Sequence, residues 1–131
     1  YKKCIAVPAG HRLAGKKKLK ISDLFGETLM MVKAGDSPIN DGIRAELEKY
    51  PQIKIEDTDH YYDISVYNKC VRTGSLLLNL ECWSNIHPSL VTIPVEWEYE
   101  MPYGLLYGKN PSEDVLRFIK AVEAVKKATR K

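Results

Sequence analysis

The chain alternates buried-strand patterns with capped helices, and this alternation limits its possible folds more than any other feature. Residues 28–32 (TLMMV) form an uninterrupted apolar run, which is typical of a strand covered on both faces. Ser37 and Pro38 then supply an N-cap and a first-turn proline for a helix whose apolar residues recur every four positions before Pro51. Alternating elements of this kind predict an α/β domain with a mainly parallel sheet and right-handed crossovers.

A second helix is predicted after residue 62. Asp63 is suited to cap it, and Gly74 is suited to end it in a left-handed conformation. Its inner face is expected to include Ile64, Tyr67 and Val71. Further strands are predicted over residues 3–7, 53–57, 75–80, 90–95 and 103–108.

A third helix is predicted from the run NPSE at residues 110–113, with Asn110 as N-cap, Pro111 in the first turn and Glu113 completing a capping box. We expect this helix to bury four apolar residues. They are Val115, Leu116, Ile119 and Val122.

Length and composition bound the number of domains. With 131 residues and 44% hydrophobic content, the chain can bury one sizeable core. It is short for two independent cores, so we expect one compact domain or one lobe of something larger. Because the chain opens Tyr1-Lys2-Lys3 without methionine, we expect a processed or engineered fragment of a longer protein. It contains no apolar stretch long enough to span a bilayer and no signal-peptide pattern, so we expect a soluble protein without membrane partners.

Cysteine usage and charge indicate the cellular compartment and the kinds of partner that the chain has. Three cysteines, without a C-x-x-C pair, argue against a disulfide framework and a zinc site and favour the cytoplasm. The net charge is +3, with lysine clusters at residues 16–20 and 126–131. Since aromatic residues do not interleave with these clusters, we interpret them as solvated surface rather than a nucleic-acid contact.

Motifs for catalysis are not found. The sequence has no nucleophile elbow, phosphate-binding loop, dinucleotide fingerprint or zinc-protease helix, so an enzyme is disfavoured and no cofactor is expected. The three histidines, His11, His60 and His87, lie in separate loops. The acidic group Glu56-Asp57-Asp59 lacks the ligand spacing of a calcium loop, so no metal is expected.

Three loops follow predicted strands and are candidates for ligand binding. In open α/β sheets, ligands collect beyond the carboxyl ends of strands, where helix N-termini offer unpaired N–H groups. These loops are residues 34–38, 58–61 and 79–83. Ordinary capping is the competing interpretation, because every helix start needs it.

The order of motifs resembles a known family. The run CIAVPAGHRLAGKKKLKISDLFGE, the helix GDSPINDGIRAEL, the phrase VRTG and the segment YGLLYGKNPSEDVLRFIKAV occur in the order found in LysR-type transcriptional regulators. The resemblance spans nearly the whole chain. It implies an effector-binding domain with the two-lobed fold of type II periplasmic solute-binding proteins.

The resemblance implies a division of the chain. Residues 1–8 are expected to hold a crossover strand, residues 9–101 the second lobe, and residues 102–131 a return strand and a helix that packs on the first lobe. Most of the first lobe, the linker helix and the DNA-binding helix-turn-helix are expected to be absent from this chain, so DNA contact belongs to that absent N-terminal domain.

The resemblance also suggests site residues. The effector-binding candidates are Asp36, Ser37, Thr58, Asp59 and Glu81. Asp36 repels anions, so a neutral or cationic effector stays open, and Glu81 is equally a surface charge or a selector of basic ligands.

Partners follow from the same resemblance. The helix after Asp63 is a candidate dimer surface, with Ile64, Tyr67 and Val71 as interface residues, and the full-length protein is expected to be a homo-oligomer. The expected function is sensing of a small-molecule effector in a bacterial transcriptional regulator. The alternatives are a transporter's solute-binding lobe and an enzyme on the same scaffold.

Overall fold

The computed structural model describes residues 1–59 and 61–129. His60, from one of the candidate loops, and the last two residues of the basic tail lie outside this description. Regular elements follow in the order β1 (Lys3–Pro8), η1 (Ile21–Leu24), β2 (Thr28–Val32), α1 (Pro38–Leu47), β3 (Lys54–Thr58), α2 (Ile64–Thr73), β4 (Leu76–Leu80), η2 (Glu81–Trp83), β5 (Leu90–Pro94) and α3 (Glu113–Thr129).

The strands form one five-stranded sheet in the order β3-β2-β4-β1-β5. β2 pairs in parallel with β3 and β4, whereas β1 runs antiparallel to β4 and β5. Four strands therefore point one way and β1 points the other. The predicted α/β class with a mainly parallel sheet and a C-terminal helix is confirmed.

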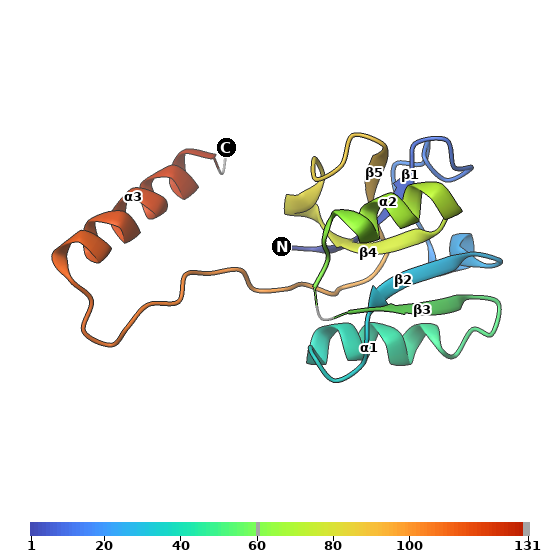
Figure 1. Ribbon diagram of the computed structural model, residues 1–131, viewed down its shortest axis with the longest axis horizontal. Helices are drawn as coiled ribbons and strands as arrows, with labels where there is room; N and C mark the ends of the chain where they lie inside the picture. The colour runs from blue at the N-terminus through green and yellow to red at the C-terminus, as the bar shows by residue number, and fades with distance from the viewer. Residues whose placement is uncertain (60, 130–131) are drawn as a thin grey trace.

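The helices cover opposite faces of the sheet, as Figure 1 shows for α1 and α2. Strand residues alternate between the two faces, because successive side chains of a strand point in opposite directions. Ile5 and Met31 pack with Ile43 of α1 in one core, and Ala6 packs with Cys70 of α2 in the other. The apolar runs are thus strands with two buried faces, as their composition predicts.

The predicted strand over residues 103–108 is wrong. All of these residues are described, yet they have no regular structure and run as an irregular segment from the sheet to α3 (Figure 1). A strand needs a neighbour to accept its backbone hydrogen bonds, and no described strand lies beside this segment. The sequence pattern was apolar enough, but the pairing partner is not in the described chain.

The third helix also differs from the prediction. α3 begins at Glu113, and the Ser112 side chain accepts a hydrogen bond from the Val115 N–H at 3.4 Å, so Ser112 takes the capping role expected of Asn110. None of its residues is buried, including the four expected to be. The reason is tertiary: in Figure 1 α3 stands apart from the sheet, so no described element covers its apolar side.

The second helix is confirmed in extent, and its inner face is confirmed at Tyr67 and Val71 but not at Ile64. Tyr67 is buried and Val71 is half-buried, but Ile64 is 63% exposed. Ile64 is the first helical residue, directly after the N-cap Asp63. Cys70 takes the fully buried position instead.

Candidate ligand-binding site

The parallel strands bring the predicted effector residues to one edge of the sheet. β2, β3 and β4 point the same way, so their carboxyl ends share an edge, and the antiparallel β1 begins at that edge with Lys3. The loops after β2, β3 and β4 carry the five candidates. Ligands collect at this type of edge because several loops and helix starts converge there.

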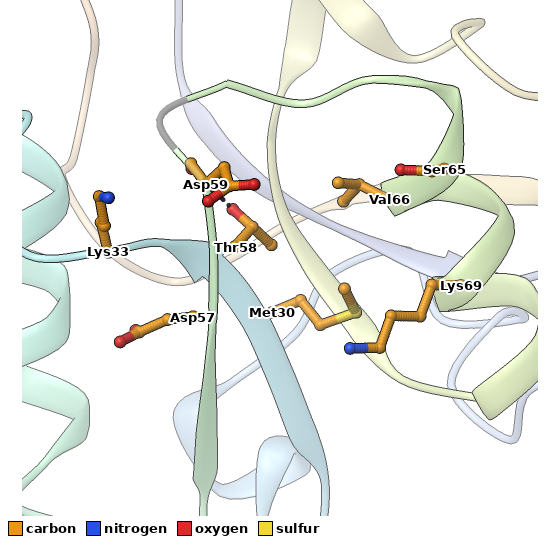
Figure 2. Close-up of a pocket in the computed structure, with 8 residues that line it drawn as sticks. All are labelled: Met30, Lys33, Asp57, Thr58, Asp59, Ser65, Val66 and Lys69. Atoms are coloured by element: carbon orange, nitrogen blue, oxygen red, sulfur yellow. Dashed lines mark hydrogen bonds between the residues drawn. The ribbon is translucent and has the colours of Figure 1, made fainter.

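Only two of the five candidates line a common hollow at this edge. Thr58 and Asp59 belong to it, and the Thr58 hydroxyl donates to the Asp59 carbonyl oxygen at 3.1 Å. The hollow has a volume of about 350 Å³ and lies between the ends of β2 and β3 and the first turns of α2 (Figure 2). Its lining residues are Met30, Lys33, Asp57, Thr58, Asp59, Ser65, Val66 and Lys69. We call it the edge hollow.

Two of the four charged side chains that line the edge hollow are paired with residues outside it. Lys69 forms an ion pair with Glu56. Asp57 accepts a hydrogen bond from Arg44 Nη2 at 2.7 Å, and Figure 2 shows its carboxylate pointing away from Lys69. The hollow also contains Lys33 and Asp59, which form no ion pair within the described residues, so its lining keeps one charge of each sign beside hydroxyl and backbone groups.

The N-terminus of α2 is already capped by its own chain. The Asp63 carboxylate accepts from the N–H groups of Ser65 at 2.9 Å and Val66 at 3.2 Å, and it also accepts from the Ser65 hydroxyl. These hydrogen bonds, led by the Ser65 side chain, hold the pKa of Asp63 below its ordinary value. A helix start that carries this negative charge is not a ready-made anion site.

The turn before α1 is likewise a cap. Ser37 Oγ accepts from the Asn40 N–H at 3.4 Å, and Pro38 occupies the first helical position as predicted. The Asp41 carboxylate accepts from the Gly35 N–H at 3.1 Å, and Gly35 has a φ of +100°, which favours glycine. Asp36 and Ser37 lie at the correct edge but outside the edge hollow.

Glu81 extends the pairing of β1 and β4. Its carboxylate accepts from the Lys2 N–H at 3.0 Å, and its own N–H donates to the Lys2 carbonyl at 3.1 Å. Glu81 is exposed and lies outside the edge hollow. Sequence reasoning missed the neighbouring Lys3, which is only 5% exposed; the signal was a lysine adjoining the apolar run CIAV.

The three interface candidates on α2 differ in what they offer a partner. Ile64 is exposed and Val71 is half-buried. Tyr67 is 7% exposed and packs in the core with Met30 and Leu77, so the chain itself covers it. The exposed apolar surface at this end of α2 comes from Ile64 and Tyr61 instead.

The described residues contain neither a metal-ligand cluster nor a membrane-spanning helix. Residues 1–59 and 61–129 contain no group of three histidine, cysteine or acidic side chains placed to hold a metal ion. His11 contacts the Glu27 carboxylate at 3.0 Å. No described helix is long and apolar enough to cross a membrane.

The fold was compared with those of known proteins. No family profile and no curated protein matches the sequence. Solved structures do match. The regulatory domain of Synechocystis PCC6803 CcmR, solved in complex with 2-PG, aligns with 97% of this chain and 64% of its own at a TM-score of 0.65 and 16% identity. The chain has the fold of a LysR regulatory domain.

Two further LysR-family structures agree. The regulatory domain of MetR from N. meningitidis aligns with 72% of this chain and 46% of its own, at a TM-score of 0.54 and 15% identity. HinK from Pseudomonas aeruginosa aligns with 75% of this chain and 34% of its own, at a TM-score of 0.52 and 18% identity. The chain thus spans between a third and two thirds of the LysR structures that it matches.

Proposed function

We propose that the chain is part of the effector-sensing domain of a LysR-type transcriptional regulator. In this assignment residues 1–8 cross between lobes, residues 9–101 form the second lobe, and residues 102–131 return to the first lobe. The observation that carries the proposal is the sheet order β3-β2-β4-β1-β5 with its open carboxyl edge, in the fold of LysR regulatory domains.

The exposed C-terminal segment supports the same assignment. Its large apolar residues lie uncovered by the chain: Tyr103, Leu105, Leu106, Tyr107, Leu116, Phe118 and Val125. A concentration of exposed large apolar residues in one segment is typical of a region that meets another folded unit. A first lobe, which the chain does not contain in this assignment, is the unit that covers it.

The proposed mechanism is a shift between open and closed lobes. A small-molecule effector binds between the carboxyl edge of this lobe and the facing first lobe. Thr58 and Asp59 of the edge hollow contact it, while Asp36, Ser37 and Glu81 stay candidates at the same edge. Because the effector contacts both walls only in the closed state, it favours that state by its difference in affinity.

The part of the protein that responds to lobe closure is proposed to lie outside this chain. An N-terminal helix-turn-helix in the longer protein contacts DNA, and the protein acts as a cytoplasmic homo-oligomer without catalytic activity. Ile64 and Val71 on α2 are the proposed contacts between subunits, since a partner can reach them whereas Tyr67 is covered. Closure then alters how the oligomer sits on DNA.

The first experiment measures the intact mass and N-terminal sequence of the protein from its source cells, by immunoprecipitation and mass spectrometry. The proposal expects a polypeptide more than twice the length of this chain that begins with a helix-turn-helix. A mature protein of 131 residues contradicts it. Substrate turnover by the intact protein favours the enzyme alternative instead.

The second experiment tests the edge hollow in that longer protein. Metabolites are screened by thermal shift, and DNA binding is then measured with the responding compound in the variants Thr58→Val and Asp59→Asn. We expect both variants to weaken the response roughly tenfold, the effect of one lost polar contact. Thr28→Val, at the opposite end of β2, is the matched control. An equal loss of the DNA-binding response in this variant contradicts effector binding at the edge hollow.

A further inference from the structure

Lys3 is a buried amine in a wall of the carboxyl edge. It is the first residue of β1, opposite Leu80 of β4, and it is 5% exposed. Its backbone is held on the other side by two long-range hydrogen bonds: its N–H donates to the Tyr99 carbonyl at 2.8 Å, and its carbonyl accepts from Trp97 Nε1 at 2.8 Å. The Lys3 backbone is therefore held between β4 and residues 97–99.

The Lys3 amine has no counter-charge among residues 1–59 and 61–129. No carboxylate lies within 4.0 Å of it, and no described group forms a hydrogen bond with it. Glu81, which follows the residue opposite Lys3 on β4, binds the Lys2 backbone instead. A buried ammonium group without a partner is costly, so its retention in a core strand calls for an anion from elsewhere.

The amine is nevertheless open to solvent at one point. The sealed, unpartnered side-chain atoms of the described chain are Asn40 Oδ1, Arg44 Nε and Asn79 Oδ1, and Lys3 Nζ is not among them. Burial lowers the pKa of Lys3 to about 8, and the thiols of Cys4 and Cys82 are the titratable groups that counteract this. The amine is still mostly protonated at pH 7, and it is not completely sealed from solvent.

We propose that Lys3 binds an anionic group, a carboxylate or a phosphate, of the effector at the carboxyl edge. The inference rests on the proposed function, because it places the effector at this edge. It assigns the anionic group of the ligand to Lys3, at the start of β1. The helix starts of α1 and α2, which Ser37 and Asp63 cap, do not take the anion.

The anionic group that pairs with Lys3 has a second possible source, which is an acidic side chain from the rest of the longer protein. The two sources differ in one measurable respect. A free anion leaves the Lys3 amine accessible in the absence of ligand, whereas a protein carboxylate covers it permanently. Comparing the 131-residue chain with the longer protein separates these cases.

The test is competitive acetylation of the 131-residue chain, followed by peptide mass spectrometry, with inorganic phosphate as the probe. Lys2 is the internal control, because it is exposed and adjacent. We expect Lys3 to acetylate with a midpoint near pH 8 and phosphate to slow it. A bound anion that raises the pKa by one unit lowers the reactive fraction about tenfold, and Lys2 is unaffected.

Three results overturn the inference. If Lys3 is acetylated only after unfolding, its amine is sealed from small molecules. If phosphate slows the acetylation of Lys2 and Lys3 equally, the effect is general ionic screening and not binding at Lys3. In the longer protein, Lys3 that is already protected without added anion has a protein carboxylate as its partner. Phosphate protection of Lys3 in a protein without a helix-turn-helix retains the anion site but rejects the proposed function.

Discussion

At the scale of single residues, the local rules of capping hold while burial is decided elsewhere. Ser37 and Asp63 cap α1 and α2 as expected from their positions. Lys3 and Ile64 reverse the expectation that charge lies outside and apolar groups inside. Both depend on which distant segments happen to pack against them.

Replacing Lys3 by methionine is expected to stabilise the chain at neutral pH. Below pH 8 the lysine is protonated in both states, so the cost of burying its charge is fully present. That cost disappears between about pH 8 and 10.5, as the folded and then the unfolded amine lose their protons. Lys3→Met should therefore gain about 1–2 kcal/mol at pH 7 and progressively less toward pH 10.5.

The measurement is the free energy of unfolding in urea, taken as the difference between Lys3→Met and the wild-type chain at each pH. Taking the difference removes the effect of the buried thiols and tyrosines, which titrate in the same range. Lys2→Met is the exposed control and should change little. A loss of stability in Lys3→Met at pH 7 shows that the amine has a stabilising partner.

The three cysteines are expected to react with a thiol reagent in two classes. Cys82 is exposed, whereas Cys4 and Cys70 are buried. Burial raises the pKa of Cys4 to about 11 and that of Cys70 to about 12, so neither forms a thiolate near pH 8. Ellman's reagent should titrate one thiol quickly and the other two only on unfolding. Rapid labelling that persists in Cys82→Ser contradicts this assignment.

At the scale of elements, helix ends and strand cores follow from short sequence patterns. The run TLMMV is a strand with two covered faces, and Gly74 ends α2 with a φ of +70°. The run YGLLYG has an equally apolar pattern yet forms no strand, because a strand also needs a neighbour to pair with.

Gly74→Ala is expected to destabilise the chain by about 1 kcal/mol, since alanine is strained in the left-handed conformation. An added Cβ at this position meets nothing within 4 Å, so the cost comes from the backbone alone. Gly15→Ala is the matched control: its Cβ also meets open space, and its φ is not positive. Thermal unfolding of both variants measures the difference, and equal effects contradict the role of the left-handed cap.

At the scale of the whole molecule, the sheet and its two covering helices form one unit to which α3 adds no buried residue. The core clusters draw on β1 to β5, α1 and α2 together with the segments around Leu13 and Trp97. The carboxyl edge, where the candidate residues gather, is therefore built without the C-terminal third helix.

Deleting residues 102–131 is expected to leave the folded sheet intact. Since none of the described residues of α3 is buried, the melting temperature should change by no more than a few degrees. The shortened chain should also associate less, because it loses the exposed apolar residues around Leu106. Circular dichroism and light scattering check the two outcomes. Unfolding of the shortened chain shows that the segment packs on the sheet.

What the sequence by itself determined is the set of elements and their caps. Periodicity, proline and glycine positions and N-cap residues act over a few neighbouring positions, so β2, α1 and α2 could be located without a structure. The same short-range signals placed all five effector candidates after strands that share one edge.

Only the tertiary structure decided which of these residues meet. It brought Thr58 and Asp59 into one hollow, and it used Glu81 to extend the pairing of β1 and β4. It also buried Lys3 through contacts with Tyr99 and Trp97, which are more than ninety positions away. These outcomes depend on strand order and long-range packing, and no short stretch of sequence contains that information.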